Sequence, residues 1–216
     1  MRLGRRAFLR RALDLALAGV PLLGAASCAA RGAYTGRMAS SSRRPSVLVF
    51  FTDQQRWDSC GCYGNPMGLT PNLDAMADRG TRLERCFTVQ PVCGPARSCI
   101  MSGRYATETG CYRNDIPLPE GIPTLARGFG AGGWFTGYIG KWHLGGAKCE
   151  GHTLGKQEPV PPARRGGFDD YWLAADVLEF FSAPDRLRLM DSEGKTVERP
   201  GYRVDAQTDL VLEFLG

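Results

Sequence analysis

Between Ser46 and Thr52 the chain runs Val-Leu-Val-Phe-Phe without a polar residue, and this run constrains the fold more than any other stretch. Because it shows no polar alternation, it predicts a strand buried on both faces, as in the parallel sheet of an α/β protein. The run ends at Asp53 and Gln54. Open α/β sheets bind ligands just beyond the carboxyl ends of their strands, so these two residues are candidates for a functional site.

Helices and strands are predicted to alternate along the rest of the chain. The segment from Thr70 to Gly80 is typical of a helix, with threonine as the cap, Pro71 in the first turn and glycine at the stop. Such alternation is typical of an α/β sandwich with a mostly parallel central sheet. The other predicted elements are strands at 83–89 and 134–140 and helices at 95–103, 123–130 and 205–215.

The positive charge of the chain is concentrated at its beginning. Residues 1–44 contain nine arginines and a single acid, Asp14, whereas the whole chain has 27 basic and 22 acidic side chains. Removing this stretch leaves 18 basic and 21 acidic side chains (27 − 9 and 22 − 1), which is a net charge of −3. A folded domain without a basic excess argues against nucleic acid as a partner.

The same beginning has the parts of an export signal. An arginine-rich start precedes an apolar run from Leu13 to Ala26, and small residues follow. The pair Arg5-Arg6 resembles the twin-arginine signal, which would make the translocation machinery a partner and the protein periplasmic or extracellular. An ordinary secretory signal and a lipid anchor at Cys28 are the alternatives. The predicted domains are a signal peptide (1–28), a flexible linker (29–45) and a folded domain (46–216).

Polar residues that can do chemistry follow the predicted strands and open one helix. Cys93 lies between the strand at 83–89 and the next helix, and Arg97 is one turn further on. Lys141 and His143 follow the strand at 134–140. Parallel strands end at one edge of their sheet, so we expect these groups to converge near the end of the first strand.

The converging groups suit an anionic, tetrahedral substrate. A helix N-terminus presents N–H groups to an anion, and Arg97 and Lys141 add cationic donors. Asp53 and Gln54 offer the hard oxygen ligands that Ca²⁺ and Mg²⁺ prefer. His143 can handle a proton near neutral pH.

Two motifs at these positions resemble the signatures of sulfatases. Cys93-Gly94-Pro95-Ala96-Arg97, followed by Ser102-Gly103-Arg104, is similar to the first signature. The stretch from Gly137 to Gly145 (Gly-Tyr-Ile-Gly-Lys-Trp-His-Leu-Gly) is similar to the second. The resemblance extends from Pro45 onward and implies an alkaline-phosphatase-like α/β/α sandwich that hydrolyses aryl or carbohydrate sulfates. Thr52-Asp53-Gln54 and Thr70-Pro71-Asn72-Leu73-Asp74 also match the family's opening.

The resemblance implies a role for each candidate. A formylglycine-generating maturation enzyme would convert Cys93 to formylglycine, whose hydrate attacks sulfur. Arg97 would hold the hydrate, Lys141 would bind a sulfate oxygen, and His143 would hydrogen-bond the hydrate. Asp53, Gln54 and the modified Cys93 would ligate Ca²⁺ or Mg²⁺. Many relatives have a second aspartate where Gln54 stands, so we expect a weakened or retuned metal site.

The resemblance also implies that part of a complete sulfatase is absent. Members of the family continue past the position of Gly216 with a second metal-ligand pair, Asp with Asn or His, that this chain does not contain. We therefore expect a C-terminally incomplete catalytic domain with weak or no activity by itself. Two other functions stay open: a phosphonate or phosphate monoester hydrolase of the same superfamily, and a non-catalytic anion-binding domain.

Several other motifs have simpler interpretations. Gly128 to Gly133 fits a dinucleotide-binding pattern but lies between a helix and a strand, so it predicts a helix stop and a turn. The segment from Arg164 to Asp170 is either a solvated turn or a substrate contact. Most of the eight cysteines are expected to be small buried residues. We expect capping, solvated or loop positions for Asp58, Asp74, Asp78 and His152.

Overall fold

The computed structural model describes residues 44–146 and 157–216. The predicted signal peptide, nearly all of the linker, Cys28, Cys149 and His152 lie outside the described residues. By its internal contacts the chain forms two units, residues 1–51 and 52–216. Within the described ranges, no helix has the length and hydropathy that crossing a membrane requires.

The buried strand predicted at 46–52 does not form. The side chains from Val47 to Phe51 are 43–73% exposed. A strand is stable only where a neighbouring strand satisfies its backbone N–H and C=O groups, and this segment belongs to no ladder of the described sheet. The prediction of a strand is therefore wrong, although the run is as apolar as a core strand.

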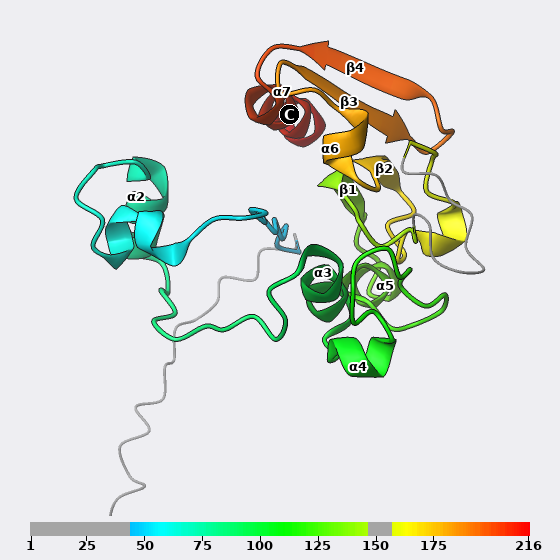
Figure 1. Ribbon diagram of the computed structural model, residues 1–216, viewed down its shortest axis with the longest axis horizontal. Helices are drawn as coiled ribbons and strands as arrows, with labels where there is room; N and C mark the ends of the chain where they lie inside the picture. The colour runs from blue at the N-terminus through cyan, green and yellow to red at the C-terminus, as the bar shows by residue number, and fades with distance from the viewer. Residues whose placement is uncertain (1–43, 147–156) are drawn as a thin grey trace, which may run out of the picture. The chain divides into compact units, whose positions relative to one another are not determined.

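The described sheet lies in the second unit and has the strand order β1-β2-β3-β4 (Figure 1). β1 (Gly137–Lys141) and β2 (Tyr171–Ala175) are parallel, whereas β3 (Arg186–Asp191) and β4 (Thr196–Pro200) continue the sheet antiparallel. The α/β class is confirmed, and the strand predicted at 134–140 forms as β1. The described sheet is mixed rather than mostly parallel, because β3 and β4 form a hairpin instead of being separated by a crossover helix.

The second predicted strand, at 83–89, does not form either. Leu83, Phe87 and Val89 are 55–85% exposed. Charged residues interrupt the apolar pattern, and Arg82 forms an ion pair with Glu84 in solvent. No strand in the described part of the chain offers this segment a partner, so its β-branched and aromatic residues do not produce a strand.

The predicted helices form with small shifts at their ends. As predicted, Thr70 precedes a helix that stops before Gly80. Two four-residue helices, α4 and α6, have no counterpart in the sequence prediction. The α-helices are α2 (Pro71–Arg79), α3 (Cys93–Ser102), α4 (Ala106–Thr109), α5 (Leu125–Ala131), α6 (Leu178–Phe181) and α7 (Arg203–Leu215), and the 3₁₀ turns are η1 (Trp57–Ser59), η2 (Gly61–Tyr63) and η3 (Pro162–Arg164).

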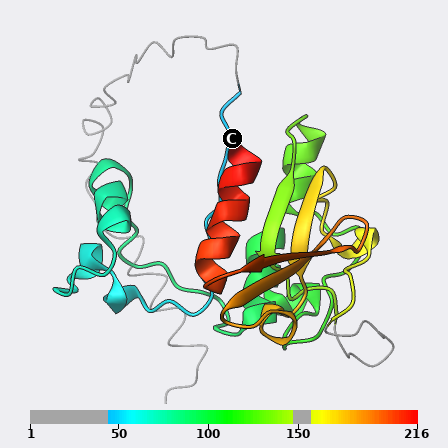
Figure 2. The ribbon, with the colours of Figure 1, turned by 90° about the horizontal axis from the view of Figure 1, so that it is seen from above.

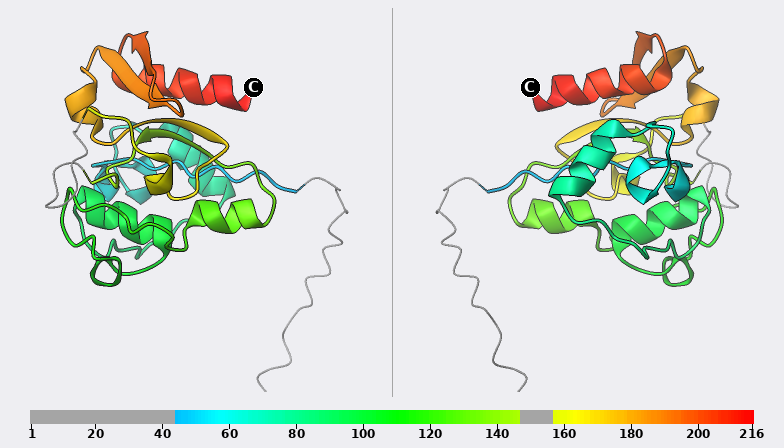
Figure 3. Two further views of the ribbon diagram at one scale, coloured as in Figure 1. Left: turned by 90° about the vertical axis from the view of Figure 1, so that its right-hand side faces the viewer. Right: turned by 90° about the vertical axis from the view of Figure 1, so that its left-hand side faces the viewer.

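Helices cover both faces of the sheet at β2. Trp172 belongs to a core cluster with Met101 of α3, whereas its neighbour Leu173 belongs to a second cluster with Leu210 of α7. Successive side chains of a strand point to opposite faces, so these two clusters lie on the two sides of the sheet. Figures 2 and 3 show α7 on one side and α3 and α5 on the other, which confirms the α/β/α layering.

The remaining motifs mostly follow the simpler interpretations. Gly133 has a left-handed φ of +80° just after α5, so the glycine-rich segment is a helix stop and a turn. Asp74 accepts hydrogen bonds from the Cys62 N–H (2.7 Å) and the Thr70 hydroxyl (3.1 Å), and so fastens the loop before α2 to that helix. The prediction for the cysteines is wrong for most of those described: all six are free, but only Cys60 and Cys111 are buried.

Candidate functional site

Cys93 is the first residue of α3, which begins two residues earlier than the helix predicted at 95–103. Val92 precedes it in an extended conformation, and the Ala96 N–H donates to the Val92 carbonyl at 2.9 Å. The Gly94 N–H lies in the first turn of the helix, where no backbone acceptor within the helix is available. It donates instead to Asn114 Oδ1 at 2.8 Å. A side chain at position 94 would come within 3.2 Å of that oxygen. The tight contact fixes the start of the helix that carries the cysteine.

Lys141 contacts three polar groups at the carboxyl end of β1. Its Nζ lies 3.8 Å from Cys93 Sγ, 3.3 Å from Asp53 Oδ2 and 2.7 Å from Glu179 Oε1. Its side chain is only 8% exposed. Glu179 comes from α6, which follows the parallel neighbour β2, so groups that follow two adjacent strand ends meet here.

Arg97 ties the same groups to the protein interior. It is buried, and its Nη2 donates to Asp53 Oδ2 at 3.0 Å. Its Nη1 donates to the Lys141 carbonyl at 2.6 Å and to the Tyr138 hydroxyl at 3.3 Å. The Tyr138 hydroxyl in turn donates to the same Lys141 carbonyl. Arg97 therefore positions both the carboxylate of Asp53 and the backbone from which Lys141 projects.

The charges in this cluster stabilise one another. Burial raises the pKa of Asp53, but the hydrogen bond from Arg97 and the charge of Lys141 outweigh it and lower the pKa overall. Burial lowers the pKa of Lys141, yet Glu179 and Asp53 raise it more. Burial raises the pKa of Glu179, and its bond to Lys141 reverses that shift. The carboxylates of Asp53 and Glu179 and the ammonium of Lys141 are therefore charged at neutral pH.

His143 faces Asp115. It is buried in a left-handed backbone conformation with φ +57°, and its Nε2 is 3.7 Å from Asp115 Oδ1. Its Nδ1 is buried without a hydrogen-bond partner among the described residues. Burial, reinforced by the charge of Lys141, lowers the pKa of the imidazole, so His143 is neutral at pH 7. A neutral imidazole keeps both a donor and an acceptor.

The described residues do not by themselves form a metal site. They contain no group of three His, Cys, Asp or Glu side chains placed to hold an ion. Asp53 Oδ2 is already paired with two cations, Arg97 and Lys141. Gln54 is exposed and lines a shallow hollow with Arg56 and Tyr202 instead of joining the cluster at Cys93. The oxygen pair at 53 and 54 falls short of the six to eight ligands that Ca²⁺ takes.

The structure thus brings together most of the residues predicted from sequence. One cluster contains Cys93, Arg97, Lys141 and Asp53. His143 instead faces Asp115, and Gln54 lines the shallow hollow. Sequence reasoning missed three polar contributors, Glu179, Asn114 and Asp115, of which Glu179 touches Lys141 directly. Tyr138 lies inside the second motif, which could have indicated it, but nothing around Glu179 predicts that α6 would place it there.

The comparisons with known proteins point in one direction. The family model described as Sulfatase matches residues 45–215. The ulvan-active sulfatase of Formosa agariphila is 38% identical over 133 residues, an alignment covering 62% of this chain and 24% of that protein. The N-acetylglucosamine-6-O-sulfatase of Bacteroides thetaiotaomicron is 29% identical over 176 residues, covering 81% of this chain and 28% of that protein.

A solved structure is similar to this chain in fold. The structure of BT4656 in complex with its substrate D-glucosamine-2-N,6-O-disulfate aligns with a TM-score of 0.63 and 27% identity. The alignment covers 80% of this chain and 31% of that one. The chain spans about a quarter of the length of the curated relatives it matches.

Proposed function

Because this chain belongs to the sulfatase family, we propose that the protein hydrolyses sulfate esters and that position 93 attacks sulfur. The observation that carries the proposal is the 3.8 Å distance between Cys93 Sγ and the Lys141 ammonium. A buried cation at that distance from the attacking atom is suited to hold an anionic oxygen of the group under attack. Removing such a contact typically lowers the rate by about 100- to 1,000-fold.

We further propose that a maturation enzyme oxidises Cys93 to formylglycine, as the resemblance implies. The half-buried thiol at the first position of α3 has one side toward Lys141, so it suits a residue that must reach both an enzyme and a substrate. Once formed, the aldehyde hydrate would supply the oxygen nucleophile in place of the thiol.

Each residue of the site then has a separate role. Lys141 binds a sulfate oxygen, and Arg97 fixes the backbone and the carboxylate on either side of it. His143, neutral and buried, accepts or donates a proton at its imidazole nitrogens. Asp53 balances the charge of Arg97 and Lys141 when no anion is bound. Asp53 and Gln54 are the oxygen ligands that would help to hold Ca²⁺ or Mg²⁺, and either ion would need further ligands than the described residues group together.

A sulfated glycan is the substrate class that we propose. The relatives named above act on ulvan and on N-acetylglucosamine 6-sulfate by their names, and BT4656 binds a disulfated glucosamine as its substrate. The second motif, which supplies Lys141 and His143, resembles the sulfatase signature and favours a sulfate ester over a phosphonate or phosphate monoester, which is the alternative within the superfamily.

Two measurements on the full-length protein test this function. Turnover of 4-nitrophenyl sulfate should exceed turnover of the matching phosphate and phenylphosphonate esters, and Cys93→Ala should abolish it. Cys99→Ala, which removes another free cysteine of α3, is the matched control and should keep full activity. Mass analysis of the peptide containing Cys93 should find the aldehyde; an unmodified thiol in a host with the maturation enzyme would contradict the formylglycine step. A preference for phosphonate would contradict sulfate ester hydrolysis, and the absence of any turnover would favour a non-catalytic anion-binding domain.

For residues 1–28 we propose export by the twin-arginine machinery to the periplasm or beyond. The support is the Arg5-Arg6 pair ahead of the apolar run. Replacing both arginines by lysine should leave the protein in the cytoplasm, as followed by cell fractionation. Continued export of the double variant would indicate an ordinary secretory signal instead.

A further inference from the structure

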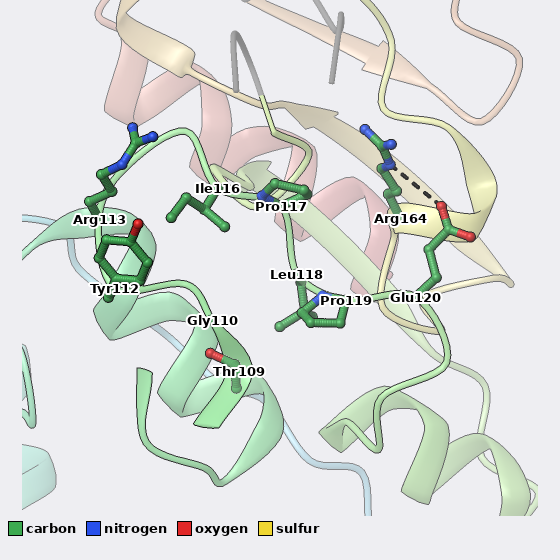
Figure 4. A pocket seen from close by; sticks show the side chains of 10 residues that line it. All are labelled: Thr109, Gly110, Tyr112, Arg113, Ile116, Pro117, Leu118, Pro119, Glu120 and Arg164. Atoms are coloured by element: carbon green, nitrogen blue, oxygen red, sulfur yellow. Dashed lines mark ion pairs between the residues drawn. The ribbon is translucent and has the colours of Figure 1, made fainter. Parts of the chain in front are cut away.

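A groove in the second unit is lined by none of the residues to which catalytic roles are assigned above. Its volume is about 560 Å³, within the ~300–1,000 Å³ range of small-molecule sites. Figure 4 shows Tyr112 and Arg113 on one wall, Arg164 and Glu120 on the other, and Ile116 and Pro117 between them. The walls are therefore charged and aromatic, whereas the strip between them is apolar.

The wall with Tyr112 is joined to the loop that carries Cys93. The Tyr112 carbonyl accepts a hydrogen bond of 2.6 Å from the side chain of Gln90, three residues before the cysteine. Two residues beyond Tyr112, the Asn114 side chain accepts from the Gly94 N–H at 2.8 Å. This wall of the groove therefore borders the start of α3.

The opposite wall is joined to the loop that carries His143. Arg164 Nη1 donates to the Gly145 carbonyl at 3.0 Å, two residues beyond the histidine. The Leu118 N–H, on the strip between the walls, donates to the Leu144 carbonyl at 2.9 Å. Both walls of the groove are therefore hydrogen-bonded to the loops that carry Cys93 and His143, and none of the residues lining the groove belongs to the cluster at Cys93.

The chemistry of the walls fits an acidic sugar. Tyr112 is 56% exposed and offers a flat aromatic face against which the C–H face of a sugar ring can pack. Arg113 is exposed on the same wall, and a guanidinium can bind a carboxylate or a sulfate with two parallel hydrogen bonds. Glu120 is paired with Arg164 at 3.5 Å, so that acid is already balanced by its own arginine.

We propose that this groove binds the sugar ring next to the sulfated one, and that Arg113 recognises an oxyanion group on that neighbouring ring. The proposal rests on the proposed sulfatase function and adds a subsite to it. Tyr112 provides the stacking surface and Arg113 the charge. A carboxylate and a second sulfate share this chemistry, and the choice between them is left to the substrates of the test.

The test compares variants of the full-length protein on substrates of graded length. The substrates are 4-nitrophenyl sulfate and three sulfated disaccharides whose second ring is neutral, carboxylated or sulfated. Arg113→Gln and Tyr112→Ala are the test variants. Arg79→Gln, an exposed arginine of α2, and Tyr105→Ala, which removes a 61% exposed tyrosine outside the groove, are the matched controls.

We expect wild-type protein to prefer one of the acidic disaccharides to the neutral one. Arg113→Gln should lower kcat/KM for that disaccharide by about 10- to 100-fold, mainly through KM, since a charged hydrogen bond is lost. Tyr112→Ala should lower kcat/KM for all three disaccharides. Neither variant should change aryl sulfate turnover by more than about twofold.

Three results would overturn the proposal in distinguishable ways. Equal loss on every substrate, including the aryl sulfate, would mean that Arg113 and Tyr112 only support the fold. If the wild type hydrolyses all three disaccharides at one rate, the proposal of an acidic subsite is contradicted. The proposed sulfatase function is not contradicted by that result. If the wild type hydrolyses none of the sulfate esters, the proposed function fails and the subsite fails with it.

Discussion

Replacing Glu179 by glutamine should strengthen the binding of anions at the site. Glu179 Oε1 lies 2.7 Å from Lys141 Nζ, which is itself 3.8 Å from Cys93 Sγ. An anion that binds Lys141 therefore approaches a carboxylate of the same sign. Glu179→Gln keeps the shape of the side chain and removes that repulsion.

The size of the effect follows from distance and exposure. Two unit charges about 4 Å apart interact with ~1 kcal/mol in water and ~4 kcal/mol in a half-buried protein environment. The side chain of Glu179 is 47% exposed, so the lower value applies. A change of about 1 kcal/mol corresponds to roughly fivefold tighter binding of sulfate. The effect should shrink as salt is added, because screening at 0.1 M ionic strength acts over about 10 Å.

The assay is inhibition of aryl sulfate turnover by inorganic sulfate at low and high ionic strength. Glu193→Gln, in the exposed turn between β3 and β4, is the matched control and should leave the inhibition constant unchanged. Weaker sulfate binding in Glu179→Gln would refute the reasoning. It would show that the carboxylate is needed to hold Lys141 in place rather than opposing the substrate.

Three further predictions concern stability and titration. Asp53→Asn should lower the free energy of unfolding by about 1–3 kcal/mol in urea denaturation, because the buried Arg97 loses its charged partner; an unchanged midpoint would contradict the ion pair. Leu189→Ala, at a fully buried position of β3, should cost about 2–5 kcal/mol in the same assay, whereas Val204→Ala at a 55% exposed position of α7 should cost far less. His143 should titrate below its ordinary value of 6.5 in an NMR experiment, because burial disfavours the imidazolium. The unfolded state then binds more protons below that pH, so stability should fall as the solution is acidified, and a pKa of 6.5 or above would contradict the buried geometry.

Much of the site could be predicted from sequence because its residues lie beside short, regular elements. Cys93 begins a helix whose end is marked by Gly103, and Lys141 ends a strand that follows a glycine turn. The chemistry of those side chains limits what they can do wherever they converge. Local patterns were therefore sufficient for Cys93, Arg97 and Lys141.

The failures share one physical cause, which is that strands depend on partners far away in the chain. The apolar run from Val47 to Phe51 has a strong strand pattern, yet it forms no ladder with the described residues. Conversely, β3 contains three charged residues and no continuous apolar run, but it is a strand because β2 and β4 bond to it on either side. Glu179 was missed for the same reason, since its position depends on where β2 ends.

The backbone around Lys141 bears on how the site should be mutated. Gly140 has φ +119° and His143 has φ +57°. Lys141 and Trp142 therefore lie between two residues whose backbone has a positive φ. A β-branched or alanine replacement at 143 would disturb this reversal as well as remove the imidazole. Asparagine tolerates the left-handed region far better than most residues. His143→Asn is therefore the substitution that separates proton transfer from chain geometry, and a conventional alanine scan would overstate the catalytic importance of the position.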